Sequence, residues 1–214
     1  MLQFVKQIAD QSGGLIIDVG CGSKPYQAIL QHDKYVGVDI YNSAHPHENE
    51  DIDLIYDGAA LPFANNAAQT IVCFEVLEHV ADVDAFLAEL RRVLEPGGRL
   101  ILTTPFMWPE HEQPYDFRRL TSFGLRQVLE TAIGPTVTYT KLVGGWAAWS
   151  ALFNGLLARW WQRGPLPVRA VVWLALRPLI FLANIAGLAA HRLGRTRDHE
   201  LFFGNAIIVE KRGD

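Results

Sequence analysis

Short apolar runs recur along the first part of the chain, and each is followed by a polar or glycine-rich segment. The clearest runs are Gly14–Val19, Tyr35–Ile40, Thr70–Val76 and Arg99–Thr104. Continuous apolar stretches of this length are typical of strands that are buried on both faces of a parallel sheet. The residues at the ends of these predicted strands are Asp18, Asp39, Glu75 and Pro105.

Segments with helical spacing lie between the apolar runs. Apolar side chains recur three and four residues apart from Phe86 to Leu94, and a Pro-Gly-Gly sequence then stops the helix. Residues 121–132 predict another helix, capped by Thr121 or Ser122, and residues 25–31 predict a short one. Two further strands are expected at residues 136–143 and 201–212. This alternation predicts an α/β fold with a doubly wound, mostly parallel sheet that binds its ligand where strands end.

Charge is unevenly divided along the 214 residues, of which 50% are hydrophobic and whose net charge is -4. Residues 1–130 carry 19 acidic and 9 basic side chains, whereas residues 131–197 carry eight basic ones and no Asp or Glu. Two regions with different surroundings are therefore implied. The first region is acidic and the basic stretch is apolar, so nucleic acid is not an expected partner.

The two cysteines, Cys21 and Cys73, are far apart and form no CxxC pair. Neither a disulfide framework nor a zinc knuckle is predicted from them. The first ten residues lack the pattern of a signal peptide. These two observations lead us to expect a cytoplasmic protein.

The loop after the first strand reads LIIDVGCGSKPY, from Leu15 to Tyr26. A dinucleotide fingerprint needs a third glycine where this loop has Pro25, and a phosphate-binding P-loop needs a Gly-Lys-Ser/Thr sequence that is missing here. What remains is a loop whose backbone can approach a ligand closely at Gly20 and Gly22, with Asp18 at its entrance. This arrangement favours a cationic or amine-bearing ligand over a phosphate.

Five blocks of sequence carry a family resemblance. In order, they are DVGCG at 18–22, GVDI at 37–40, DGAALPF at 57–63, CFEVLEHV at 73–80 and LRRVLEPGGRLILTTPF at 90–106. Their order and spacing resemble the class I S-adenosylmethionine-dependent methyltransferases, in particular the small-molecule group called type 11. The resemblance implies the Rossmann-like fold of that class, the cofactor S-adenosyl-L-methionine and a methyltransferase activity.

The resemblance also implies roles for individual residues. Gly20 and Gly22 would run beside the methionine part of the cofactor, Asp18 would lie near its amino group, and Asp39 would accept hydrogen bonds from the ribose. Asp57 would face the adenine amine, and Phe74 and Glu75 would lie near the sulfonium. Cys21 is expected to be a small filler rather than a nucleophile, and Cys73 a core residue. The full expected cofactor-binding set is Asp18, Gly20, Cys21, Gly22, Asp39, Ile40, Asp57, Gly58, Ala59, Phe74 and Glu75.

The segment PFMWPEHEQPYDFRRLT, from Pro105 to Thr121, is the candidate acceptor side. Its composition resembles that of type 11 members found in polysaccharide and lipid pathways. His111 is the preferred general base, with Glu112 or Asp116 as its orienting carboxylate, and the competing interpretation is a histidine that bridges backbone groups. Arg118 and Arg119 either bind an anionic acceptor or pair with Asp116.

Glu75, Glu78 and His79 would share one face if their segment were helical. Sets of this spacing resemble the metal site of ubiquinone-pathway O-methyltransferases and small-RNA 2′-O-methyltransferases, with His111 as a fourth ligand. The same sequence is also common in metal-free members of the family. The prediction is therefore that there is no metal, and that His79 anchors the loop.

Residues 146–199 fall where class I enzymes make a tight connection between their last two strands. We expect an apolar helical insertion there, so that residues 1–145 and 200–214 form the core domain. Polar side chains within the insertion gather in one sector of a predicted helix, and the rest is apolar. A lid, a homodimer surface and peripheral contact with a membrane remain the alternatives.

The predicted function is methyl transfer from S-adenosyl-L-methionine to a small-molecule or lipid- or glycan-linked acceptor. One alternative is a non-catalytic scaffold or partner subunit that keeps the fold, and another is a nicotinamide oxidoreductase. The intact Asp18, Gly20, Gly22, Asp39 and Asp57 argue against the scaffold. Pro25 argues against the oxidoreductase.

Overall fold

The computed structural model describes residues 1–41, 51–144, 154–155, 176–182, 184–185, 189 and 202–213. The named elements, in chain order, are α1 (Leu2–Gln7), η1 (Ala9–Gln11), β1 (Leu15–Val19), β2 (Lys34–Ile40), β3 (Leu54–Tyr56), β4 (Ala68–Phe74), η2 (Leu77–His79), α2 (Val83–Val93), β5 (Leu94–Pro105), α3 (Ser122–Ala132), β6 (Thr136–Gly144) and β7 (Phe202–Glu210). The elements η1 and η2 are single 3₁₀ turns.

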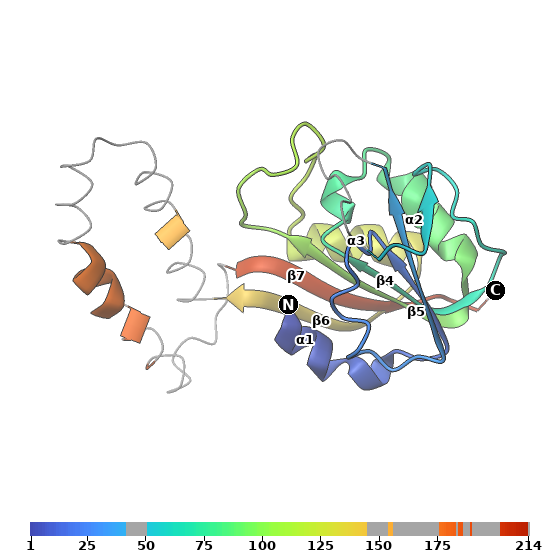
Figure 1. The fold of residues 1–214 in the computed structure, drawn as a ribbon, viewed down its shortest axis with the longest axis horizontal. Coiled ribbons are helices and arrows are strands. Elements are labelled where there is room, and N and C mark those ends of the chain that lie inside the picture. Colours follow the sequence, from blue (N-terminus) through green and yellow to red (C-terminus); the bar gives the residue numbers. More distant parts are fainter. Residues whose placement is uncertain are drawn as a thin grey trace. The chain divides into compact units, whose positions relative to one another are not determined.

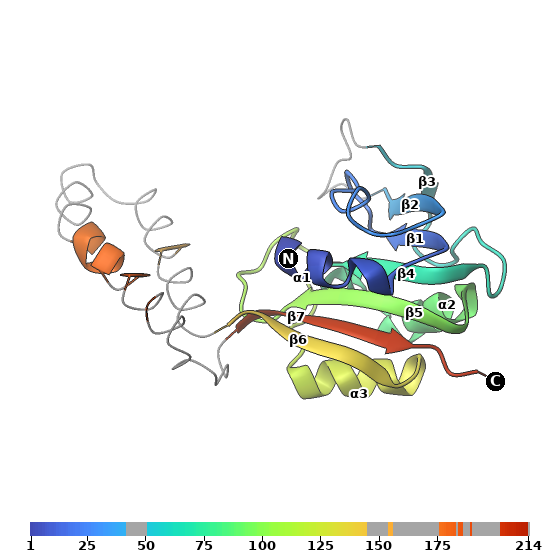
Figure 2. The ribbon, with the colours of Figure 1, turned by 90° about the horizontal axis from the view of Figure 1, so that it is seen from below.

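The strands form a seven-stranded sheet in the order β3-β2-β1-β4-β5-β7-β6, which Figure 2 shows from one end to the other. Neighbours from β3 to β5 are parallel, whereas β7 runs antiparallel to β5. The strand order reverses between β1 and β4. In such sheets the ligand lies beyond the carboxyl ends of the strands at this reversal, so the ends of β1, β2 and β4 mark the candidate site.

Helices cover both faces of the sheet (Figure 1). On one face, α2 and α3 pack their apolar side chains, including Leu87, Leu90 and Leu129, against the strands. On the other face, Phe4 and Val5 of α1 pack against Ile16, Val72 and Ile101 from three central strands. Because the central strands are covered on both sides, their apolar runs are continuous rather than alternating.

Local signals explain where α2 begins and which face it buries. The side chain of Asp82 accepts a hydrogen bond of 3.0 Å from the backbone N–H of Ala85, which satisfies a donor of the first turn. Phe86, Leu87, Leu90 and Val93 are all buried, as their helical spacing predicts. In α3 the cap is Thr121, whose side chain accepts from the N–H of Gly124 at 3.1 Å.

The α/β fold class and the doubly wound, mostly parallel sheet are confirmed, but the predicted helix at residues 25–31 is wrong. Residues 25–30 form a run of turns instead, with one helix-like bond from the N–H of Leu30 to the carbonyl of Tyr26. Lys24 has a φ of 51°, outside the right-handed helical region, and the segment is too short to form a stable helix after this break.

By contact, the chain divides into two compact units, Met1–Leu142 with Gly204–Asp214, and Val143–Phe203. Most of the predicted insertion at residues 146–199 lies outside the described residues, so its helical character and its role as a lid, dimer surface or membrane element stay predictions. Residues 176–182 are helical, and Leu179, Phe181 and Leu182 are exposed. None of the helices in the described parts of the chain is long and apolar enough to cross a membrane.

Replacement of Leu90 by Ala tests the packing of α2. Leu90 is fully buried, so Leu90→Ala should lower the free energy of unfolding by about 2–5 kcal/mol through lost contacts and a new cavity. Chemical denaturation measures the change. Leu2→Ala is the matched control, because Leu2 is also helical but half exposed, and it should cost less than about 1 kcal/mol. Equal losses in the two variants would contradict this assignment of the core.

Candidate functional site

The turn after β1 brings its backbone unusually close to neighbouring elements. Gly20 has a φ of 73°, and a Cβ at this position would lie 2.3 Å from Cγ2 of Val76, so only glycine fits without rearrangement. The N–H groups of Gly20 and Cys21 both donate to the carbonyl of Val38 on β2, at 2.9 and 3.2 Å. The turn is therefore attached to the end of the next strand.

Asp39 closes this arrangement at the end of β2. Its Oδ2 accepts a hydrogen bond of 2.9 Å from the N–H of Gly22, and its Oδ1 accepts one of 2.8 Å from the N–H of Ile40. The carboxylate is thus fixed beside the glycine turn, at the reversal of the strand order. This hydrogen bond joins Gly22 to Asp39, two residues that were predicted from different sequence blocks.

Asp18 lies deeper and has a partner that the sequence did not reveal. The Oδ2 of Asp18 accepts a hydrogen bond of 2.5 Å from the hydroxyl of Tyr35, and Asp18 is only 3% exposed. Burial raises the pKa of Asp18 to about 7, and Asp39 adds to the rise, while the bonds with Tyr35 and the charge of Lys24 oppose it. Near neutral pH this carboxyl is therefore divided between its charged and neutral forms.

Cys21 is buried in the same turn, where it fills space. A Cβ on Gly37 of β2 would lie 2.7 Å from the sulfur of Cys21, so the two residues fit together closely. Burial and the nearby carboxylates of Asp18 and Asp39 raise the pKa of the thiol to about 12. A thiol that stays protonated is a poor nucleophile, which supports the expectation of a filler.

Lys24 and Asp53 form a second connection that the sequence did not indicate. The Nζ of Lys24 donates to Oδ2 of Asp53 at 2.9 Å, and the same oxygen accepts from the N–H of Gly37 at 2.7 Å. Hydrogen bonds from Lys24 and from Gly37 lower the pKa of Asp53. Asp53 precedes β3, a three-residue strand that is too short to have been recognised from its apolar pattern.

Asp57 stabilises the turn that follows β3. Its Oδ1 accepts from the N–H of Ala59 at 2.9 Å and from that of Ala60 at 3.3 Å, and these bonds lower its pKa. Gly58 has a φ of 82°, and a Cβ there would lie 3.6 Å from Cγ2 of Ile40. The Asp57 turn is therefore next to the end of β2, as the expected cofactor-binding set requires.

Phe74 ends β4, which pairs with β1 on the side opposite to β2, and Glu75 follows directly. The ring of Phe74 packs edge-on against Tyr26, with 5.3 Å between the ring centres. Glu75 has a φ of 56°, an uncommon conformation for a residue other than glycine, and its N–H donates to the carbonyl of Thr103 at 3.1 Å. The condition for Glu75, Glu78 and His79 to share one helical face is not met, because the helical turn η2 begins only at Leu77.

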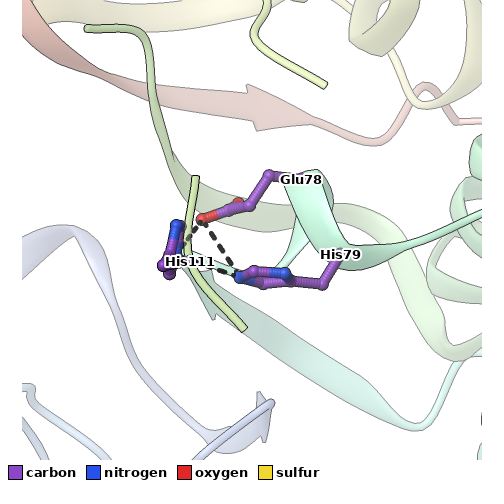
Figure 3. A group of neighbouring side chains, drawn as sticks. All are labelled: Glu78, His79 and His111. Atoms are coloured by element: carbon purple, nitrogen blue, oxygen red, sulfur yellow. Dashed lines mark hydrogen bonds and ion pairs between the residues drawn. The ribbon is translucent and has the colours of Figure 1, made fainter. Parts of the chain in front are cut away.

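Glu78, His79 and His111 do gather beyond the end of β4 (Figure 3). One ligand-type atom from each residue lies within 4.8 Å of the others. Glu78 and His79 come from η2, and His111 comes from the segment after β5. The side chain of Glu78 is fully buried, and burial together with the charge of Glu75 raises its pKa to about 8.

Asp116 is the carboxylate beside His111, one of the two that the sequence offered. Its Oδ2 accepts from the backbone N–H of His111 at 3.0 Å and lies 3.2 Å from Nδ1 of the same residue. Arg119 donates to both oxygens of Asp116, at 2.5 and 2.7 Å, and its hydrogen bonds lower the pKa of Asp116 to about 2. Asp116 is therefore ionised and held in place.

The two arginines of the segment make contacts within the chain. Arg119 binds Asp116, and Arg118 donates to the carbonyls of Leu77, Val80 and Ala81, on both sides of His79. Arg118 thus ties the segment after β5 to η2 and the residues that follow it. These contacts favour the pairing interpretation for Arg119 over a contact with an anionic acceptor.

Comparison with known proteins now adds to this geometry. Residues 17–102 match the family described as "Methyltransferase domain". Similar proteins include a probable S-adenosylmethionine-dependent methyltransferase of Mycolicibacterium smegmatis, 30% identical over 56% of this chain and 52% of its own length. A ubiquinone biosynthesis O-methyltransferase of Coxiella burnetii is 30% identical over 48% of each chain. The chain thus spans about half the length of these curated relatives.

Among solved structures, the YcgJ protein of Bacillus subtilis is similar in fold, with a TM-score of 0.56 and 16% identity, over 100% of this chain and 98% of that one. At this level of identity the similarity shows a shared fold. Residues 17–102 match a methyltransferase domain, and the 30% identical relative is named as a probable S-adenosylmethionine-dependent methyltransferase.

Within the methyltransferase domain, the family match covers β2, β3 and β4 with η2, α2 and most of β1 and β5. It includes every residue of the expected cofactor-binding set, together with Glu78 and His79. His111 and Asp116 lie beyond it. Sequence reasoning missed Tyr35, Lys24 and Asp53, whose polar atoms serve the site from β2, the glycine loop and the approach to β3.

The raised pKa of Asp18 predicts a pH dependence of stability. The folded state retains this proton up to about pH 7, whereas the unfolded chain loses it near pH 3.8, so rising pH removes stability between these values. Asp18→Asn should remove this contribution. Relative to the unchanged protein, its free energy of unfolding should improve by about 2 kcal/mol from pH 5 to pH 8, as measured by urea denaturation.

Asp33→Asn is the matched control, because Asp33 is an exposed aspartate directly before β2. Its difference from the unchanged protein should stay constant over the same pH range. If the difference for Asp18→Asn also stays constant, Asp18 does not hold its proton as described.

Proposed function

We propose that the protein transfers a methyl group from S-adenosyl-L-methionine to a small-molecule or lipid- or glycan-linked acceptor. The observation that carries this proposal is the hydrogen bond from Gly22 to the Asp39 carboxylate at the reversal of the strand order. It combines a backbone turn without side chains and a carboxylate at a strand end, which together suit a nucleoside with a charged amino-acid tail.

Each part of the cofactor has a proposed partner in this site. Asp39 accepts hydrogen bonds from the ribose hydroxyls, and the backbone of Gly20, Cys21 and Gly22 runs beside the methionine part. The Asp57 turn, with Gly58 and Ala59, borders the adenine next to Ile40. Support comes from the contact distance between Gly58 and Ile40, which brings the two segments to one edge of the sheet.

The remaining residues of the proposed site lie near the amino group and the sulfonium of the cofactor. Asp18 lies near the cofactor's ammonium group, which would favour the charged form of this carboxyl and shift its pKa down on binding. Phe74 and Glu75 border the sulfonium and the methionine end. The left-handed backbone of Glu75 supports this role, because strained conformations of this kind cluster at functional sites.

Methyl transfer from a sulfonium is an in-line displacement. The bond between the acceptor atom and the methyl carbon forms while the carbon–sulfur bond breaks, and the electron pair of that bond neutralises the sulfur. Alignment alone contributes as much as about 7–11 kcal/mol in ideal intramolecular cases. The fixed turn of β1 and the fixed segment after β5 therefore act chiefly by holding the two reactants in line.

His111 is the proposed catalytic residue on the acceptor side, and Asp116 orients it. The Asp116 carboxylate near Nδ1 favours the tautomer with its proton on that atom, which leaves Nε2 free of a proton. Nε2 is then able to take the proton of an acceptor hydroxyl. Arg119 keeps Asp116 ionised and in position, so it acts on His111 through Asp116.

Exposed aromatic side chains support an acceptor with an apolar part. Trp108, Tyr115 and Phe117 belong to the same segment as His111 and are 53%, 40% and 47% exposed. Such side chains bind flat or apolar groups well. The relative named as a ubiquinone biosynthesis O-methyltransferase is consistent with an acceptor of this kind.

Calorimetry with S-adenosylmethionine tests the proposed cofactor site. Asp39→Asn should weaken binding about 10–100-fold, because hydrogen bonds to a charged group contribute about 1.5–3 kcal/mol. Asp33→Asn, an exposed aspartate from the same part of the chain, should bind like the unchanged protein. A lack of binding by the unchanged protein would favour the scaffold alternative, and an unchanged affinity of Asp39→Asn would remove Asp39 from the site.

Transfer of labelled methyl groups tests the reaction itself. The protein is incubated with methyl-labelled donor and extracts of lipids, glycans, small molecules and nucleic acids. We expect label in one of the first three extracts and a loss of about 10²–10⁴-fold in rate for His111→Gln, with donor affinity unchanged. His32→Gln, which alters an exposed histidine elsewhere, is the matched control. Label in nucleic acid alone would overturn the proposed acceptor class.

A further inference from the structure

Glu78 places a carboxyl group in the interior, beside two histidines and without a hydrogen bond to any described residue. The residue is 0% exposed, and neither carboxylate oxygen has a hydrogen-bond partner among the described residues. A buried carboxylate without partners is costly, and such groups in native proteins usually serve a bound ion, a water or a reaction. The nearest polar groups are the two histidines at 3.8 and 4.0 Å.

The two histidines direct the same kind of atom toward each other. Nδ1 of His79 lies 3.0 Å from the carbonyl oxygen of Tyr115, which can only accept, so Nδ1 carries the proton. Nδ1 of His111 makes no hydrogen bond with good geometry, but it lies 3.2 Å from the ionised Asp116, whose negative charge favours a proton there as well. In their neutral forms, both Nε2 atoms then present lone pairs to each other across only 3.2 Å. A cation between the two nitrogens would accept both lone pairs, and a proton shared by the two rings is the alternative.

The spacing of the three atoms identifies what would fit. Nε2 of His79, Nε2 of His111 and Oε1 of Glu78 form a triangle with sides of 3.2, 3.8 and 4.0 Å. The point equidistant from the three atoms is about 2.1 Å from each, within the ~2.0–2.2 Å bonds of zinc to histidine nitrogen and carboxylate oxygen. Figure 3 shows the three side chains converging.

We propose that Glu78, His79 and His111 bind one divalent cation of the zinc type. Two imidazoles and one carboxylate suit zinc and similar first-row metals, whereas magnesium prefers oxygen ligands. Metal-binding histidines normally donate their other N–H to an oxygen, and Nδ1 of His79 has such a partner in the carbonyl of Tyr115. Nδ1 of His111 lies 3.2 Å from the Asp116 carboxylate. The set differs from the one expected from sequence spacing, because Glu75 is not part of it.

Three protein ligands leave coordination positions open, as in catalytic zinc sites. If the proposed methyl transfer holds, an acceptor hydroxyl binds there and its proton passes to water, because the cation lowers the pKa of a bound O–H group. The oxygen then forms the bond to the methyl carbon while the carbon–sulfur bond breaks, and the cation is unchanged. Nε2 of His111 would serve as a ligand in this state, in place of the direct base.

The first test is metal binding by the tag-free, chelator-treated protein without donor or acceptor. Titration calorimetry with zinc chloride should show one site per chain, and affinity should fall at least about tenfold in Glu78→Gln and in His79→Gln. His32→Gln is the matched control and should bind zinc normally. Magnesium chloride should bind much more weakly. Absence of stoichiometric binding, or equal binding by all variants, would overturn the proposal in favour of a proton shared by the two histidines.

A second test compares the melting temperature with and without zinc, which separates a loss of metal binding from a folding defect. Without metal, Glu78→Gln should be about as stable as the unchanged protein, because an amide of similar shape replaces a carboxyl group that makes no hydrogen bond to the described residues. With zinc, the melting temperature of the unchanged protein should rise and that of Glu78→Gln should stay constant. A rise of equal size in both would contradict the site. Because neither measurement uses S-adenosylmethionine, failure here leaves the proposed methyl transfer standing, and failure of donor binding leaves the cation site standing.

Discussion

The close approach of the β1 turn to β2 is the constraint on which the candidate site depends. Gly20, Cys21 and Gly22 are all tied to the end of β2, two through the carbonyl of Val38 and one through the carboxylate of Asp39. Cys21 and Gly37 fit together beneath the turn, and Lys24 reaches Asp53 on its far side. The surface that would receive the donor is thus assembled from backbone groups, whose positions are set by the sheet.

The acceptor side is organised differently, by side chains that reach across a loop. Arg119 fixes Asp116, Asp116 fixes His111, and Arg118 ties the same segment to the carbonyls around η2. The segment after β5 has no regular secondary structure, so these charged contacts hold it in place. They also bring His111 to His79, a residue 32 positions away in the chain. The proposed donor site and the proposed acceptor site therefore rest on two different kinds of support.

The sequence revealed the strands of the sheet and the residues at their ends, because buried parallel strands leave a continuous apolar signal that stops at polar groups. It did not reveal β3, whose three residues carry too little pattern, and it wrongly favoured a helix after Pro25. The hydrogen bond between Tyr35 and Asp18 depends on strand register, which no local pattern encodes. The meeting of Glu78, His79 and His111 likewise depends on the path of the segment after β5.

The packing of Gly20 against Val76 joins the two halves of the site at one point. Val76 stands directly before η2, the turn that carries Glu78 and His79, and its side chain would be 2.3 Å from a Cβ at position 20. A methyl group added at position 20 would push on Val76, and Val76 is joined through the backbone to η2. The absence of a side chain at this one position therefore keeps the glycine turn and η2 in register.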